Sequence, residues 1–94
     1  MEKVKELLRN GLPLSLAVKA VLAGDAGQPS RSLSRVALER GVNGSDLSAA
    51  INGTKIASPR MIEAMVAEFG GTVEEWRQLF SDAMQRRAAA AVGQ

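Results

Sequence analysis

The chain has 94 residues, of which 46% are hydrophobic and 23% are charged, and its formal net charge is +2. This length suits one small domain, and this composition is typical of a globular rather than a disordered chain. The sequence has no Cys and no His, which excludes disulfides, structural zinc, thiol chemistry and histidine acid–base catalysis. We therefore expect no enzyme, no metal site and no cofactor, and the near-neutral total does not by itself indicate a polyanionic partner.

The stretch Leu12 to Ala23 is apolar, but Lys19 interrupts it. It is also shorter than the roughly 20 residues that a membrane span needs. Glu2 and Glu6 lie where a signal peptide would be positive. We expect a cytoplasmic protein with no membrane partner.

Glycine and proline divide the chain into helix-sized segments, and no segment alternates as a strand does. The predicted helices, in chain order, are Glu2–Asn10, Pro13–Ala23, Leu33–Arg40, Ser45–Ile51, Pro59–Phe69 and one that begins after Thr72. A loop is predicted over Gly24–Ser32, and a second loop over Thr54–Ala57. The sequence therefore predicts an all-α fold.

The starts and stops of these helices follow from capping residues. Ser32 and Ser58 are predicted N-caps, the second strengthened by Pro59 at the first helical position. Thr72 with Glu75 three residues later matches a capping box. The last helix is apolar at Val73, Trp76, Leu79, Phe80, Ala83 and Met84. We expect Trp76 and Val73 to close the core, and the alanine-rich end, residues 86–94, to fray.

The segment Leu33–Gly53 carries the most informative pattern of the chain. Two short helices are joined at Gly41, which can adopt the left-handed conformation that a sharp turn needs. Ala37 is small where the two helices must cross closely. These are the physical requirements of a helix-turn-helix, in which one helix crosses the phosphate backbone and holds the next in the major groove.

The chain at this point resembles the phage-repressor family (Cro and lambda-repressor-like, or xenobiotic-response-element). The matching features are Val36-Ala37, Gly41-Val42, Leu47, Asn52-Gly53, and the stretch Phe69–Trp76 that follows a further loop and helix. The resemblance covers about residues 14 to 80. It implies a compact five- to six-helix lambda-repressor-like bundle that contains a helix-turn-helix. The whole chain, 1–94, would be one domain with an additional helix at about 2–10, a core at about 13–80 and a C-terminal extension at about 81–94.

In this family the front of the second motif helix faces the base edges. Carried onto this chain, the candidates for base contacts are Asn43, Gly44, Ser45, Asp46, Ser48 and Ala49. Ser45 is either a base reader or only an N-cap, and Asp46 is either a reader or a first-turn acid that compensates the helix dipole. Family members often carry Gln at the start of the first motif helix and on the recognition helix, where this chain has Leu33 and Gly44-Ser45. The family's sequence preference is therefore not carried over.

Candidates for phosphate contacts lie at the start of the first motif helix and after the second. They are Arg31, Ser34, Arg35, Asn52, Thr54, Lys55 and Arg60. Residues 31–60 hold five basic and two acidic residues, hence +3, whereas residues 61–82 hold one basic and five acidic residues, hence −4. The near-neutral total therefore conceals a predicted basic face and an acidic end.

The apolar strip of the last helix predicts a homodimer interface at Leu79, Phe80, Ala83 and Met84. The alternative is that this helix folds back onto the N-terminal helix of a monomer. The leading function is a sequence-specific regulator that binds double-stranded DNA at a near-palindromic operator and is nucleoid-associated when bound. One alternative is a HigA-type antitoxin that binds a toxin and represses its own operon, because Phe69–Leu79 resembles the end of such proteins. Another is a protein-interaction module without DNA affinity.

Overall fold

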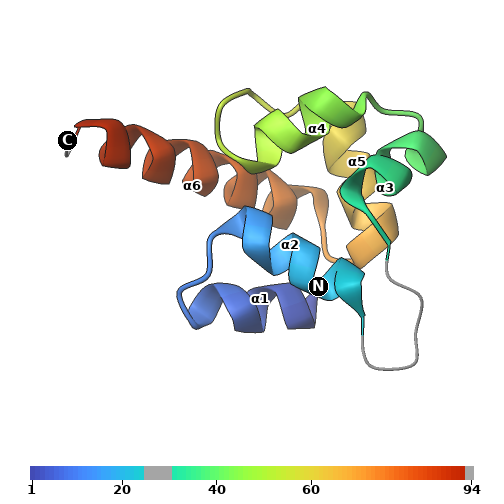
Figure 1. Cartoon of the computed structure of the whole chain (residues 1–94), viewed down its shortest axis with the longest axis horizontal. Coiled ribbons are helices and arrows are strands. Elements are labelled where there is room, and N and C mark those ends of the chain that lie inside the picture. The colour runs from blue at the N-terminus through green and yellow to red at the C-terminus, as the bar shows by residue number, and fades with distance from the viewer. Residues whose placement is uncertain (25–30, 93–94) are drawn as a thin grey trace.

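The computed structural model describes residues 1–24 and 31–92, and these residues form six α-helices and no strand (Figure 1). In chain order the helices are α1 (Glu2–Arg9), α2 (Leu14–Ala23), α3 (Leu33–Arg40), α4 (Gly44–Ile51), α5 (Pro59–Phe69) and α6 (Val73–Val92). The all-α prediction is confirmed, and the predicted helix starts are correct to within one residue. Most of the loop predicted for Gly24–Ser32 lies outside the described residues.

Side-chain caps begin three helices as predicted. The hydroxyl of Ser32 accepts a hydrogen bond from the backbone N–H of Arg35 at 3.1 Å. The hydroxyl of Ser58 accepts one from Met61 at 3.3 Å, and Pro59 occupies the first position of α5. Thr72 accepts the backbone N–H of Glu75 at 3.1 Å. Each cap satisfies a backbone donor that the first turn of a helix leaves open.

The cap of α4 differs from one of the two expectations. The side chain of Asn43, not that of Ser45, accepts the backbone N–H of Asp46, at 3.0 Å. Ser45 is therefore already inside the helix, and the interpretation of this serine as an N-cap is wrong. Asparagine is as good a cap as serine, and it precedes Ser45 in the chain.

The last helix is longer than expected. α6 continues through the alanine-rich stretch as far as Val92, where the sequence predicted fraying. Alanine has the highest helix propensity of any residue, so a run of alanines extends an existing helix at little cost.

The buried side chains of all six helices form one cluster, and Trp76 lies within it with none of its surface exposed. Its ring centroid lies 5.6 Å from that of Phe69 and 6.0 Å from that of Phe80. Its indole N–H donates to the carbonyl oxygen of Gly70 at 2.9 Å. The polar edge of this large side chain is thus satisfied inside the core.

Two expectations for α6 need correction. Val73 is 41% exposed and does not close the core, unlike Trp76. Phe80 is only 3% exposed, so it packs inside the monomer rather than on an apolar strip at the surface. Helical periodicity gives the face on which residues lie, but the width of that face depends on the neighbouring helices.

α1 is part of the core rather than an appendage. Val4 is fully buried in the common cluster. The amino group of Met1 donates to the carbonyl oxygen of Phe69, and Lys5 pairs with Glu75 at the start of α6. The hydrogen bond from Lys5 holds the pKa of Glu75 below its ordinary value and raises the pKa of Lys5. These contacts hold the start of α1 against the end of α5 and the start of α6.

The elements surround α6 unevenly. The first turns of α6 lie against the rest of the molecule, whereas its last turns project beyond it (Figure 1). α6 contacts α2, α4 and α5, while α3 contacts α4 and α5. Within the described ranges, none of the helices combines the length and the hydropathy that a membrane crossing requires.

Candidate nucleic-acid interface

The turn between α3 and α4 is tight because of its glycine. Gly41 has φ +71° and ψ +31°, in the left-handed region, and ends α3. The backbone N–H of Val42 then donates to the carbonyl oxygen of Ala37 at 2.9 Å. Only the residues from Gly41 to Asn43 separate the two helices.

The two helices cross closely where both have small residues. Ala37 is 1% exposed, and a Cβ placed on Gly44 would lie 3.9 Å from the Cβ of Ala37 and 4.0 Å from the Cα of Ser34. A larger residue at position 37 would force the helices apart. The orientation of α4 relative to α3 is therefore fixed at this crossing.

The residues expected to contact bases have different surroundings. Gly44 lies against α3, and Asn43 is used as the cap of α4. Ser48 and Ala49 are half-buried, whereas Ser45 is exposed. Ser45 has no hydrogen-bond partner among the described residues, so it is the open polar side chain at the front of α4.

Asp46 has a partner within the protein. It lies in the first turn of α4, where a carboxylate compensates the helix dipole. It also pairs with Lys55 of the following loop, with 2.7 Å between Oδ1 and Nζ. Lys55, expected at a phosphate, is thus held beside a carboxylate of α4.

The arginines expected at phosphates belong to a cluster of charges that we call the α3–α5 ion cluster. It consists of Arg31, Arg35, Glu39, Arg40 and Glu68. Arg31 contacts both carboxylates, Arg35 Nε lies 3.0 Å from Glu39 Oε1, and Arg40 Nη2 lies 3.0 Å from Glu68 Oε2. Three arginines thus face two carboxylates, which leaves one net positive charge.

The two carboxylates of the cluster differ in exposure. The side chain of Glu68 is 7% exposed and contacts the guanidinium groups of Arg31 and Arg40, so it joins the flanks of α3 to α5. The side chain of Glu39 is 42% exposed. The hydrogen bond from Arg35, together with the charge of Arg31, holds the pKa of Glu39 below its ordinary value. Glu39 therefore remains ionised beside the arginines at neutral pH.

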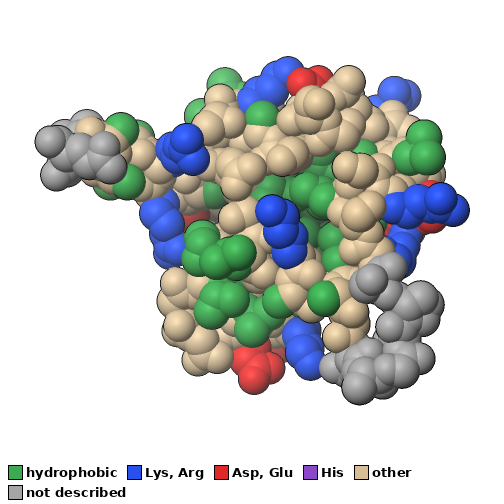
Figure 2. All heavy atoms as spheres, in the orientation of Figure 1, with side chains coloured by type: hydrophobic (Ala, Val, Ile, Leu, Met, Phe, Trp, Pro, Cys, Tyr) green, Lys and Arg blue, Asp and Glu red, His purple; other side chains and the backbone are tan. Residues whose placement is uncertain are grey.

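The predicted basic face is weaker than the local charge count indicated. Glu68 lies outside the 31–60 segment and neutralises part of it. On the face drawn in Figure 2, Lys and Arg side chains are scattered rather than gathered in one patch. Arg60, at the second position of α5, is exposed and has no ion-pair partner among the residues that the structure describes.

The remaining candidates lie around the end of α4. Thr54 donates through its hydroxyl to the carbonyl oxygen of Ala49 at 3.0 Å, which closes the end of the helix. Asn52 is exposed at the C-cap, and Ser34 is exposed on α3. The structure therefore brings together α3, the front of α4 and the loop after it, but many of their polar groups already have partners.

The residues expected at a dimer interface also make contacts within the monomer. Ala83 lies against Gly53, whose Cα is so close that an added Cβ would lie 2.7 Å from the carbonyl carbon of Ala83. Leu79 and Met84 are half-buried, and Phe80 is in the core. Only part of the predicted strip is thus available to a second molecule.

The chain was compared with protein-family models, with curated proteins and with solved structures. None of these comparisons gives a match. Among the described residues, no group of three or more carboxylates could hold a metal ion.

Proposed function

We propose that this protein is a sequence-specific, double-stranded DNA-binding transcriptional regulator of the bacterial or phage-repressor type. In this proposal α3 and α4 act as a helix-turn-helix, with α4 in the major groove and α3 across the phosphate backbone. The observation that carries the proposal is the close crossing of α3 and α4 at Ala37 and Gly44, with Ser45 exposed at the front of α4. Such a regulator acts in the cytoplasm, as a homodimer on a near-palindromic operator.

The candidate phosphate-binding cations differ in whether they already form ion pairs within the protein. Arg60 is open, whereas Arg31, Arg35 and Lys55 must exchange a carboxylate for a phosphate. The N-terminus of α3 adds backbone N–H groups that favour an anion. Phosphate contacts would hold the protein in register, and Ser45 with Ser48 and Ala49 would read the bases.

The proposal is tested by titrating the purified protein with duplex DNA at rising salt concentration. With Arg31, Arg35, Lys55 and Arg60 at phosphates in each protomer of the dimer, affinity should fall by up to about 10⁴-fold between about 50 mM and about 200 mM salt. Absence of binding at low salt would overturn the proposal. It would favour the protein-interaction module, for which the extensive pairing of the interface cations is the supporting observation.

Replacing Arg60 by alanine should weaken binding to all duplex sequences by a similar factor and reduce the salt dependence by about one ion per protomer. Replacing Ser45 by alanine should instead change the preference between operators. Competition binding with selected and scrambled duplexes measures both effects. Arg77→Ala, which removes an exposed arginine of α6 paired with Glu74, is the matched control and should leave binding unchanged. A change of preference in Arg60→Ala would contradict the phosphate assignment.

Replacing Glu39 by glutamine should increase DNA affinity about fivefold at low salt, because it removes a like charge beside the phosphates and frees Arg35. Fluorescence anisotropy with one duplex measures the change. Glu74→Gln removes a carboxylate from another exposed ion pair, with Arg77, and serves as the control. Equal affinities of Glu39→Gln and the unaltered protein would show that α3 does not approach DNA.

A further inference from the structure

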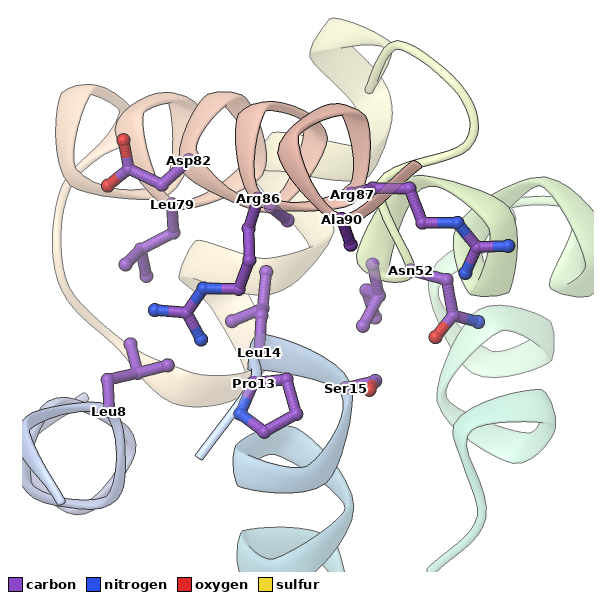
Figure 3. Close-up of a pocket in the computed structure, with 12 residues that line it drawn as sticks. Leu8, Pro13, Leu14, Ser15, Asn52, Leu79, Asp82, Arg86, Arg87 and Ala90 are labelled. Carbon is purple, nitrogen blue, oxygen red and sulfur yellow. The ribbon is translucent and has the colours of Figure 1, made fainter. Parts of the chain in front are cut away.

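An open groove of about 430 Å³ runs beside α6, bounded by the α1–α2 corner and the end of α4 (Figure 3). Its apolar surface comes from four helices, through Leu8, Leu14, Ile51, Leu79, Ala83 and Ala90. Figure 3 shows Leu8 of α1 and Leu79 of α6 pointing into the same space. Hydrophobic side chains are also visible over α1 and the adjoining corner in Figure 2. The groove is partly open to solvent and lined by residues of four helices, which suits a helix better than a small enclosed ligand.

Opposite charges line the α6 side of this groove. Asp82, Arg86 and Arg87 all border it. Asp82 accepts a hydrogen bond from Gln78 at 2.8 Å but has no cationic partner in the described part of the chain. Arg86 and Arg87 likewise have no carboxylate partner there, and Figure 3 shows Arg86 extending over the groove toward Pro13. The groove therefore has one carboxylate and, about one helical turn further along α6, two guanidinium groups.

The end of α6 itself lacks a covering surface. Residues 88–91 are all exposed alanines, and the last turns project beyond the body of the molecule (Figure 1). Helical stability in proteins comes mainly from packing rather than from propensity. The exposed end of α6 from one molecule could therefore pack into the apolar groove of another molecule.

We propose that a second copy of this chain covers the groove, with the two α6 helices antiparallel about a two-fold axis. In one register of the two helices, Asp82 lies opposite the partner's Arg86. The two-fold axis then also places Arg86 opposite the partner's Asp82. Within one residue, the same register places Leu79 opposite the partner's Ala90, a large side chain against a small one. Such a contact is isologous and closed, because each molecule supplies the same surface.

This inference specifies the homodimer of the proposed function and rests on that part of it, but not on DNA binding. An unrelated helical partner would need neither the reciprocal Asp82–Arg86 pair nor the Leu79–Ala90 match. A second copy supplies both the exposed end of α6 and the groove, so one two-fold contact covers both surfaces at once.

Sedimentation equilibrium of the purified chain without DNA tests the proposal. The unaltered protein should be a dimer. Asp82→Arg and Arg86→Asp should each weaken self-association at least about tenfold, because each variant places like charges opposite one another. An equimolar mixture of the two variants should form a heterodimer, since arginine at 82 and 86 in one chain meets aspartate at 86 and 82 in the other.

Arg77→Asp is the control, because it makes the same change of charge on α6 at a position that does not line the groove. It should leave the dimer intact, and circular dichroism should show that all variants remain helical. A monomeric unaltered protein, or a dimer insensitive to both charge changes, would overturn the proposal. So would failure of the mixed variants to associate. A dimer without DNA affinity would support this inference while the DNA-binding proposal fails.

Discussion

Replacing Gly53 by alanine should lower the free energy of unfolding by about 3 kcal/mol. Gly53 has φ +80°, which an L residue adopts with strain. A Cβ there would also lie 2.7 Å from the carbonyl carbon of Ala83 and closer still to its oxygen. Because the obstacle is the backbone of α6, no rotamer change can relieve it, and the loop after α4 must move. Denaturant unfolding followed by circular dichroism measures the loss.

Gly41→Ala separates the two causes of this loss. Gly41 has φ +71°, but an added Cβ would meet no atom within 4 Å. Alanine there should cost only the backbone strain, about 1 kcal/mol. If both variants lost the same stability, the close approach of the loop to α6 would be refuted. In the DNA-binding proposal Gly53→Ala should also weaken binding, because the loop that it displaces carries Thr54 and Lys55.

Replacing Trp76 by alanine should lower the free energy of unfolding by about 4 kcal/mol. The indole is fully buried between Phe69 and Phe80, and its N–H bonds to Gly70. Removal leaves a cavity where the helices meet and takes away the hydrogen bond to Gly70. For a domain of this size the loss corresponds to a melting temperature lower by about 20 °C, which differential scanning calorimetry measures.

Val73→Ala is the comparison for Trp76→Ala. Val73 belongs to the same helix and was expected in the same core, but it is 41% exposed. Its replacement should change the free energy of unfolding by no more than about 0.5 kcal/mol. A large loss for Val73→Ala, or a small one for Trp76→Ala, would contradict the placement of these side chains.

The caps show what the sequence alone could establish. Ser32, Ser58 and Thr72 each bond to a backbone N–H three residues later. Such contacts are local, so residue type and position predict them. Even the error at α4 was local, since Asn43 competed with Ser45 as the cap.

Contacts between distant segments could not be predicted. Glu68 pairs with Arg40 across 28 residues and with Arg31 across 37 residues. Its spacing within α5 gives no sign of these partners, so the charge count for 31–60 omitted it. The same holds for Val4, which is buried through the packing of α1. A hydrophobic period predicts that a side chain is buried, but not which helices cover it.

For the candidate site, the sequence indicated the elements but not the state of the side chains. The sequence indicated α3, the front of α4 and the following loop. It could not indicate that Gly44 would lie against Ala37, nor that Lys55 would pair with Asp46. Both facts depend on the crossing angle of two helices and on the course of a loop, which no local pattern determines.

The α3–α5 ion cluster has a consequence for a cell under osmotic stress. The chain has no histidine that could act as a pH switch, so the concentration of dissolved ions is the variable that acts on the cluster. Dissolved ions weaken arginine–carboxylate pairs as they weaken arginine–phosphate contacts. In the DNA-binding proposal Arg31 or Arg35 would leave a carboxylate for a phosphate, so one pair would replace another and the two sensitivities to salt would partly cancel. Occupancy of an operator would then vary less during an osmotic upshift than the number of arginines at the interface suggests.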